Sequence, residues 1–214
     1  MSLTIILTAH LKPTLQEALD SIAAQTSQDF ECIVMDSGYR DSRPTLPPNT
    51  EWHETGEPPD LRGHKCPVSW ATNETIRRGL VRGRYVATFY DDDVYEPTFV
   101  ERVVDYLDTT GEPAVWFTQN RATMAGVYGQ IRADRVLVPG SIDNRVDGGQ
   151  VVFTRDALMA LGDPWMPEDP ADGSCRHSDG IFLERLCASI GSISPLDEML
   201  MTHRNTPFST YSPG

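Results

Sequence analysis

The chain has 214 residues, of which 39% are hydrophobic and 8% aromatic, so it can bury one substantial core but is short for two full-sized domains. Its 31 acidic and 18 basic residues give a formal net charge of -13, which repels nucleic acids and anionic membrane surfaces. No apolar run approaches the roughly 20 residues of a membrane helix, and the first residues lack the pattern of a signal peptide. We therefore expect a single-domain cytoplasmic protein with no membrane segment and no nucleic-acid partner.

The first half of the chain alternates between short apolar strands and amphipathic helices. Residues 4–8 form a β-prone run that predicts a strand, and residues 32–35 predict a second strand that ends at Asp36. Between them, Thr14 and Glu17 have the spacing of a capping box and begin a helix whose apolar residues share one face. A strand, a helix and a strand in this order predict two parallel strands joined by a crossover.

The remaining elements continue this alternation and then change to a strand-rich pattern. We expect a proline-rich loop at 40–67 with a short strand near 51–54, a helix over 68–80, a strand over 84–90, a helix opened by Pro97, strands over 115–118, 127–138 and 150–154, and helices over 155–161 and 179–190. The sequence therefore predicts an α/β fold of the Rossmann-like, doubly wound kind with helices on both faces. The tail at 206–214 contains two prolines, and we expect it to be mobile or to act as a lid.

Three polar clusters follow predicted strands. They are the segment 8–10, Asp36, and the acidic triplet Asp91, Asp92 and Asp93. Doubly wound sheets bind ligands beyond the carboxyl ends of their strands, so we expect these clusters to meet in one crevice.

The acidic triplet predicts a metal site. Adjacent carboxylates repel one another unless a cation or hydrogen-bond donors offset the charge, and Mg²⁺ and Mn²⁺ prefer carboxylate and phosphate oxygens. The alternative is a solvated acidic turn that caps the following helix, but the convergence of three polar clusters favours a metal bridge to a nucleotide diphosphate. Zinc is not expected, because the four cysteines form no CxxC pair and Cys175 with His177 offers too few ligands.

Several segments resemble the motifs of one enzyme family in order and spacing. They are residues 4–10, 33–38, 71–73, 83–93 and 148–155, and Ser178-Asp179 followed by Leu183, Arg185 and Leu186. Together they resemble glycosyltransferase family 2 with the GT-A fold, over most of the chain except the region 121–144. The resemblance implies a single domain at 1–205 with a mixed sheet, in which 1–110 is the nucleotide-sugar donor half and 111–205 the acceptor half.

The resemblance also implies site residues. The donor is expected to contact Thr8, Ala9, His10, Asp36, Asn73, Asp91 and Asp92. A divalent cation, Mn²⁺ or Mg²⁺, is expected at Asp93, Asp91 and His203, with Arg204 as the alternative late contact. The acceptor is expected near Gly148 and Gly149. The implied reaction is an inverting transfer from a nucleotide diphosphate sugar, most simply a UDP-sugar, to an acceptor hydroxyl whose identity stays open. Asp179 matches the general base that takes the hydroxyl proton.

Alternatives exist for individual residues and for the function. Asp179 beside Ser178 would also stabilise the first turn of a helix without catalysis, and Trp165 would either stack on an acceptor sugar or pack in the core. Where the family has paired carboxylates, this chain has Asp36-Ser37 and Ser178-Asp179, as in a nucleotide-sugar binding protein that has lost turnover. A nucleotidyltransferase is the weaker alternative, because no glycine-rich basic loop follows the first strand.

Overall fold

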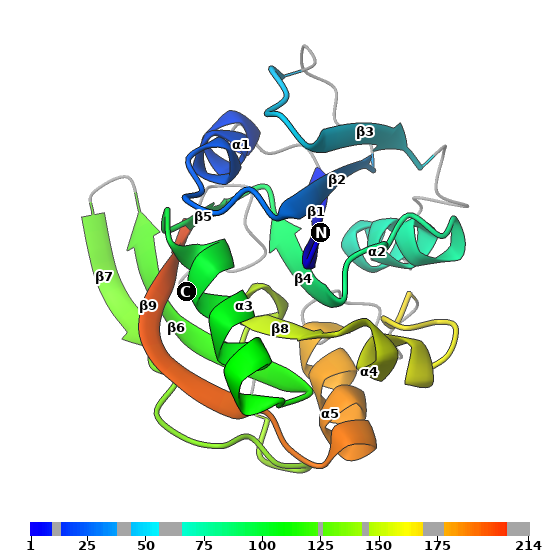
Figure 1. Ribbon diagram of the computed structural model, residues 1–214, viewed down its shortest axis with the longest axis vertical. Helices are drawn as coiled ribbons and strands as arrows, with labels where there is room; N and C mark the ends of the chain where they lie inside the picture. The colour runs from blue at the N-terminus through cyan, green and yellow to red at the C-terminus, as the bar shows by residue number, and fades with distance from the viewer. Residues whose placement is uncertain are drawn as a thin grey trace.

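The computed structural model describes residues 1–9, 14–37, 44–55, 66–123, 126–142, 146–168 and 178–204 (Figure 1). The predictions for His10, for Cys175 with His177 and for the tail at 206–214 concern residues outside these ranges.

The described chain forms one mixed sheet flanked by helices. Its strands are β1 (Leu3–Ala9), β2 (Phe30–Asp36), β3 (Thr50–Glu54), β4 (Tyr85–Tyr90), β5 (Asp93–Tyr95), β6 (Ala114–Thr123), β7 (Gly126–Ile131), β8 (Val151–Thr154) and β9 (Ser194–Arg204). Its helices are α1 (Leu15–Ala23), α2 (Pro67–Arg77), α3 (Phe99–Thr110), α4 (Arg155–Ala160) and α5 (Ser178–Ile190), together with the 3-10 turn η1 (Gly148–Gln150).

The order of the strands is β3-β2-β1-β4-β8-β6-β9-β5, and β7 pairs with β6 off this path. The first four strands are parallel, as the crossover pattern predicts, whereas β8 runs antiparallel to both β4 and β6. The predicted mixed α/β sheet is thus confirmed.

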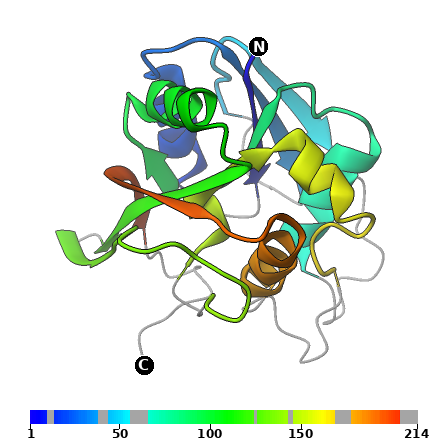
Figure 2. The same cartoon turned by 60° about the horizontal axis from the view of Figure 1, so that its bottom comes forward.

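Helices cover both faces of the sheet, as predicted (Figure 2). Successive side chains of a strand face opposite sides, so Ile5 and Leu7 of β1 pack with α1 and α3, whereas Ile6 packs with residues of α2, α4 and α5. Two apolar clusters result, one on each face, and they hold the sheet rigidly enough to position groups at its edge.

The predicted capping box at the start of α1 is wrong. Thr14 precedes the helix, but its side chain makes no capping bond. Its hydroxyl donates instead to the carbonyl oxygen of Asp91 at 2.6 Å, and Glu17 forms an ion pair with Arg204 at the end of β9. The side chains of Thr14 and Glu17 therefore contact the acidic triplet and the end of β9, and they do not cap α1.

The second half of the sheet departs from the prediction in length and number of strands. The strand expected over 127–138 ends at Ile131, because the chain then crosses to other partners: the Ala133 amide donates to the Thr118 hydroxyl, and Leu137 bridges Ile193. Two strands, β5 and β9, were not expected. The first has only three residues, and the second contains Pro195 among charged side chains, so neither has the apolar pattern of a strand.

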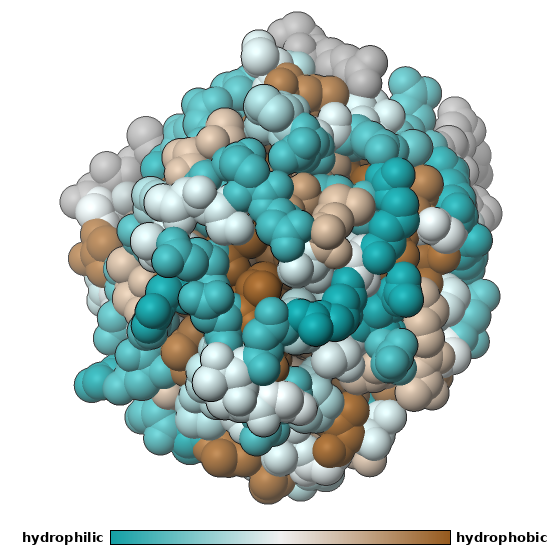
Figure 3. All heavy atoms as spheres, viewed as in Figure 1, coloured by the Kyte–Doolittle hydropathy of each residue, from teal (hydrophilic) through white to brown (hydrophobic). Residues whose placement is uncertain are grey.

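Hydrophilic side chains are spread over the face drawn in Figure 3, with apolar ones scattered among them. Within the described parts of the chain, no helix is both long enough and apolar enough to pass through a membrane.

Candidate active site

The carboxyl ends of three parallel strands lie side by side, as the sequence predicts. Ala9 at the end of β1 is opposite Asp36 of β2, and Thr8 is opposite Tyr90, the residue before the acidic triplet. Thr8 and Ala9 are buried, and the Ala9 carbonyl accepts hydrogen bonds from the amide and hydroxyl of Ser37 at 3.0 and 3.1 Å. The predicted donor contacts of β1 and β2 thus share one edge of the sheet.

The acidic triplet is buried at this edge, so the alternative of a solvated acidic turn is wrong. Asp91, Asp92 and Asp93 are 2%, 1% and 0% exposed. Their backbone is held from both sides, since the Asp91 carbonyl accepts from Thr14 and the Asp92 carbonyl accepts from the Arg204 amide at 3.0 Å. Burying carboxylates is costly unless they are paired or bind a cation, so this arrangement needs a compensating positive charge.

A histidine from the last strand supplies part of that charge. Antiparallel pairing of β5 with β9 places His203 opposite Asp93, and the two side chains are joined by a hydrogen bond of 2.8 Å between Nδ1 and Oδ1. Atoms of Asp92, Asp93 and His203 that could ligate a metal lie within 4.8 Å of one another. Asp91, which we predicted as a ligand, is not in this group, whereas Asp92, predicted as a donor contact, is.

The donor set fits a divalent cation. Oδ2 of Asp93 is buried and has no hydrogen-bond partner among the described residues. A buried carboxylate oxygen without a partner is expensive, and a metal ion is one of the few partners that satisfies it. Two carboxylates and an imidazole are ligands that Mn²⁺ accepts, and the carboxylates also suit Mg²⁺.

Burial sets the protonation of this pair. It raises the pKa of Asp93 to about 7, against the opposing effect of the hydrogen bond and charge of His203. Burial alone would lower the pKa of His203, but the hydrogen bond and charge of Asp93 outweigh it and raise that pKa to about 9. The hydrogen bond and the opposite charges thus favour the imidazolium and carboxylate forms of the pair. A metal ligand must offer a lone pair, so binding of a cation through a ring nitrogen of His203 would release the proton from that nitrogen.

A diglycine turn lies beside Asp93. The turn η1 is fixed by a capping box in which the Asp147 side chain accepts from the Gly149 amide at 3.1 Å and the Gln150 side chain accepts from the Asp147 amide at 3.0 Å. A Cβ on Gly149 would lie 2.9 Å from Oδ2 of Asp93, and one on Gly148 would lie 3.2 Å from Cγ of Asp179. The two predicted acceptor-side glycines therefore let the turn fit between two carboxylates.

Asp179, the predicted base, lies on the other side of this turn. Its Oδ1 accepts a hydrogen bond from the Tyr90 hydroxyl at 3.0 Å, and its Oδ2 accepts from the Gly148 amide at 3.3 Å. Burial, together with the charge of Asp147, raises the pKa of Asp179 to about 7. A carboxylate with a pKa near neutrality can take up and release a proton at physiological pH, as a general base must.

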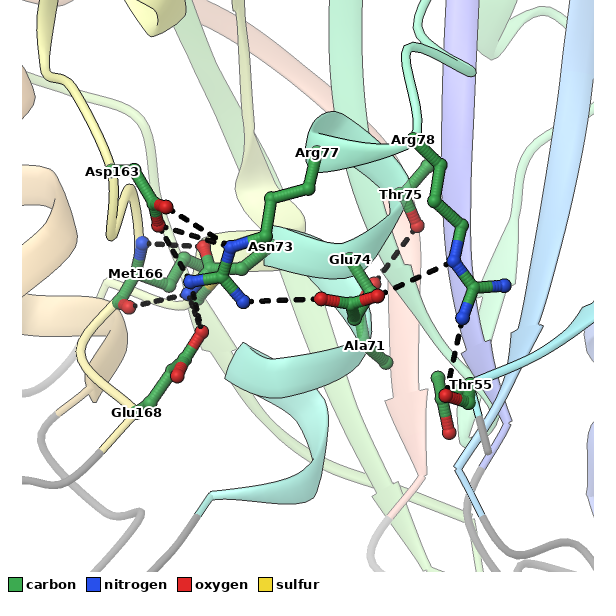
Figure 4. Close-up of polar contacts among 10 residues, drawn as sticks. All are labelled: Thr55, Ala71, Asn73, Glu74, Thr75, Arg77, Arg78, Asp163, Met166 and Glu168. Atoms are coloured by element: carbon green, nitrogen blue, oxygen red, sulfur yellow. Dashed lines mark hydrogen bonds and ion pairs between the residues drawn. The ribbon is translucent and has the colours of Figure 1, made fainter. Parts of the chain in front are cut away.

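Asn73, a predicted donor contact, is hydrogen-bonded to the segment that precedes α5 (Figure 4). It is fully buried in α2, and its amide donates to the Met166 carbonyl and to Glu168 at 2.8 Å each, while its Oδ1 accepts from the Met166 amide at 2.9 Å. Arg77, one turn later, pairs with Glu168 and Asp163 at 2.7 and 2.5 Å. These contacts bind the segment that precedes α5 to the donor half of the chain.

Trp165, the predicted acceptor contact, belongs to the same segment. It is partly buried and packs against the apolar cluster of α2, α4 and α5, as the core alternative predicts. Its contact with an acceptor stays a prediction.

Sequence reasoning missed Tyr90, which contacts the candidate base, and Thr88, Tyr95 and Asp147, which contact its turn. Tyr90 was counted only as a β-prone residue, although it directly precedes the triplet. Asp147 and Gln150 have the spacing of a capping box, and that signal was available in the sequence.

A mixed sheet covered on both faces, with an acidic and histidine cluster at its carboxyl edge, is the arrangement expected of a glycosyltransferase of the GT-A class. The comparisons with known proteins agree. The family model described as glycosyl transferase family 2 matches residues 4–159, and the chain belongs to this family. The predicted family, the single-domain GT-A fold and the class of enzyme are thereby confirmed.

Individual relatives are distant. An uncharacterized glycosyltransferase of Haemophilus influenzae is 26% identical over 104 residues, which are 49% of this chain and 32% of that protein. The chain thus spans about a third of the length of this curated relative.

Among solved structures, S. aureus TarS 1–349 in complex with UDP-GlcNAc has a TM-score of 0.72 at 16% identity, covering 98% of this chain and 60% of that one. The same fragment in complex with UDP has a TM-score of 0.70 at 17% identity, covering 97% and 61%. A longer TarS structure has a TM-score of 0.71 at 16% identity, and the match covers 97% of this chain and 37% of that one. At such identities the similarity shows the fold alone.

Proposed function

We propose that the protein transfers a sugar from a nucleotide diphosphate sugar to an acceptor hydroxyl with inversion, using a divalent cation. The observation that carries this proposal is the placement of two carboxylates, the buried Asp93 and the partly buried Asp179, on either side of the diglycine turn. Asp93 with His203 lies on one side, and Asp179 lies on the other. A transfer needs a positive charge near the leaving phosphate and a base near the attacking hydroxyl, and the two sides supply them separately.

The donor in this proposal is a UDP-sugar held by residues 1–110. Support comes from the shared sheet edge of Thr8, Ala9 and Asp36, and from the structural similarity to TarS, which was solved with UDP-GlcNAc and with UDP. Asn73 acts indirectly, because its amide is occupied within the protein.

The cation would be held by Asp92, Asp93 and His203, while Asp91 of the Asp91-x-Asp93 motif faces the ribose or the diphosphate. When bound, it would stabilise the negative charge that develops on the leaving phosphate. The imidazole favours Mn²⁺ over Mg²⁺, because Mg²⁺ strongly prefers oxygen ligands.

The acceptor half, residues 111–205, contributes the base. The acceptor oxygen attacks the anomeric carbon, the bond from that carbon to the phosphate oxygen breaks, and the nucleotide diphosphate leaves with the electron pair. Asp179 takes the hydroxyl proton. Gly148 and Gly149 line the boundary between the acceptor and the cation.

A second candidate function is nucleotide-sugar binding without turnover. The observation that favours it is Ser37, which stands where the family has a second carboxylate and is buried with its hydroxyl bonded to Ala9. That position therefore serves the fold rather than a ligand.

The test is to incubate the full chain with UDP-GlcNAc, with and without Mn²⁺, and to measure thermal stability and release of UDP. The proposal predicts Mn²⁺-dependent stabilisation together with Mn²⁺-dependent release of UDP, by hydrolysis or by transfer to added acceptors. Stabilisation without any release, across a panel of UDP-sugars and acceptors, would favour the binding protein. No stabilisation by any nucleotide sugar would refute both functions.

A further inference from the structure

Asp179 is held by a closed ring of hydrogen bonds that begins and ends on β4. The Thr88 hydroxyl donates to the Gly148 carbonyl at 3.1 Å, the Gly148 amide donates to Oδ2 of Asp179 at 3.3 Å, and the Tyr90 hydroxyl donates to Oδ1 of Asp179 at 3.0 Å. Thr88 and Tyr90 are two residues apart, so their side chains leave the strand on the same face. One rigid strand thereby fixes both the turn and the carboxylate.

The ring depends on the absence of a side chain at Gly148. A Cβ at this position would lie 2.6 Å from the Tyr90 hydroxyl oxygen and 3.2 Å from Cγ of Asp179. The turn therefore approaches the two side chains as closely as a backbone can. Each oxygen of Asp179 accepts one of these hydrogen bonds and keeps further lone pairs for a ligand.

The groups around Asp179 determine how readily it ionises. Burial and the charge of Asp147, which precedes the turn, disfavour the carboxylate, and Cys66 at the start of α2 acts in the same direction. The Gly148 amide and the Tyr90 hydroxyl favour it. A tyrosine hydroxyl is protonated near neutral pH, so Tyr90 can donate to Asp179 throughout that range.

We propose that Tyr90 is a positioning residue that, together with the Gly148 amide, orients the Asp179 carboxylate toward the acceptor. This inference rests on the proposed function for the role of Asp179 as base. The inference requires only the hydroxyl of the Tyr90 side chain. The aromatic ring is positioned by the end of β4 and is retained in Tyr90→Phe.

The test uses the carboxyl carbon of Asp179 as a probe in the full chain without metal. Protein labelled with ¹³C at the aspartate carboxyl groups is titrated by NMR, and Asp179→Asn assigns the signal. Removing one hydrogen bond to a charged group by Tyr90→Phe should raise the midpoint of Asp179 by about one pH unit. Turnover at pH 7 should then fall by about fivefold with an unchanged KM for the donor, and it should recover at higher pH.

Tyr95→Phe is the matched control. The Tyr95 hydroxyl is also buried, but it donates to the Gly149 carbonyl at 3.2 Å rather than to Asp179. This variant loses a comparable hydrogen bond in the same region and should leave the midpoint of Asp179 unchanged. If Tyr90→Phe does not fold, Gly148→Ala provides the test, because the added carbon would lie 2.6 Å from the Tyr90 hydroxyl oxygen and 3.2 Å from Cγ of Asp179, so the contact between them should break and the midpoint of Asp179 should shift to higher pH.

An unchanged midpoint in the Tyr90 variant, or an equal shift in the Tyr90 and Tyr95 variants, would overturn the inference. These outcomes are separate from failure of the proposed function. A wild-type chain that never releases UDP from a UDP-sugar refutes the proposed function, whereas the carboxyl titration reports on Tyr90 and Asp179 regardless of turnover.

Discussion

The two sides of the diglycine turn carry the same functional group in different surroundings. On one side, Asp93 pairs with the imidazole of His203 and leaves Oδ2 buried without a hydrogen-bond partner among the described residues. On the other side, both oxygens of Asp179 accept hydrogen bonds from neutral donors, and within the described chain Asp179 makes no ion pair. Burial raises the pKa of each carboxyl to about 7, so burial alone does not distinguish them.

The difference lies in the partners. Asp93 has a partner that can ligate metals and a buried oxygen without a hydrogen-bond partner among the described residues, so in the proposed function this side holds the cation. Asp179 has donors that stabilise its charged form without neutralising it, so in the proposed function this side exchanges the proton. Gly148 and Gly149 lie between the carboxylates of Asp93 and Asp179, so the two groups are neighbours but remain separate.

The largest expected effect is that of Asp179→Asn on turnover. The amide cannot accept the acceptor proton, so release of UDP during transfer should fall by roughly 10²–10⁴-fold. Affinity for UDP with Mn²⁺ should remain within a few-fold of wild type, because the cation is held on the other side of the turn. Steady-state kinetics and calorimetric titration with UDP measure the two quantities. Turnover that survives the substitution would place the base elsewhere.

Asp93→Asn should have the opposite pattern. Removing the carboxylate should abolish the stabilisation by UDP that depends on Mn²⁺, which in wild type amounts to about 2.7 kcal/mol when the ligand is at 100 times its dissociation constant. Thermal unfolding with UDP, with and without Mn²⁺, measures this effect. Asp179→Asn is the matched control, since it removes one carboxylate that contacts the same turn and should retain the stabilisation. Equal loss in both variants would contradict the assignment of separate roles.

A smaller effect is expected from Gly149→Ala. Its Cβ would lie 2.9 Å from Oδ2 of Asp93, so the carboxylate has to move, and affinity for Mn²⁺ should weaken by about 10- to 100-fold. The carboxyl titration of Asp179 should not change, because the Gly149 Cβ is directed at the Asp93 side. Electron paramagnetic resonance of free Mn²⁺ measures the affinity. A shift in the titration midpoint of Asp179 with no change in Mn²⁺ affinity would contradict the assignment of Gly149 to the Asp93 side of the turn.

The smallest effect is a pH dependence in which activity and stability move in opposite directions. The pKa of Asp179 is about 7 in the folded chain, above its usual value, because burial disfavours the carboxylate. This group therefore contributes stability that is fully present at pH values below its unfolded pKa and is lost as the pH rises through about 7. Turnover requires the ionised form and should rise over the same range.

The difference between wild type and Asp179→Asn in denaturant unfolding, measured from pH 4 to pH 9, isolates this contribution. The free energy of unfolding of wild type should decline relative to the variant as the pH increases. A relative increase would mean that Asp179 is stabilised as an anion in the folded chain.

The sequence predicts the first half of the fold well, because its strands are short apolar runs that end in polar residues. Thr8, Asp36 and Asp91 follow such runs directly, and parallel strands bring their ends together without further information. The same local pattern led to one error at the start of α1. Thr14 and Glu17 have capping-box spacing, but their tertiary partners, Asp91 and Arg204, compete successfully for both side chains.

The second half is less predictable, since its site residues depend on pairings distant in sequence. The pairing of β5 with β9 brings Asp93 to His203 across 110 positions, and neither strand has a periodic apolar pattern. Only the resemblance to the family indicated His203. For Asn73 the motif indicated a donor contact, which stays a prediction, but it did not indicate that the buried amide binds Met166 and Glu168.

The most direct test of the separate roles is a crystal structure of the full chain with Mn²⁺ and UDP, in which manganese is located by its anomalous scattering. The account predicts one strong peak at roughly 2.0–2.6 Å from Oδ2 of Asp93, beside His203, with Asp179 still bonded to Tyr90 and Gly148. A manganese peak at Asp179, or a peak remote from both carboxylates while Asp93 keeps only His203 as its partner, would contradict it.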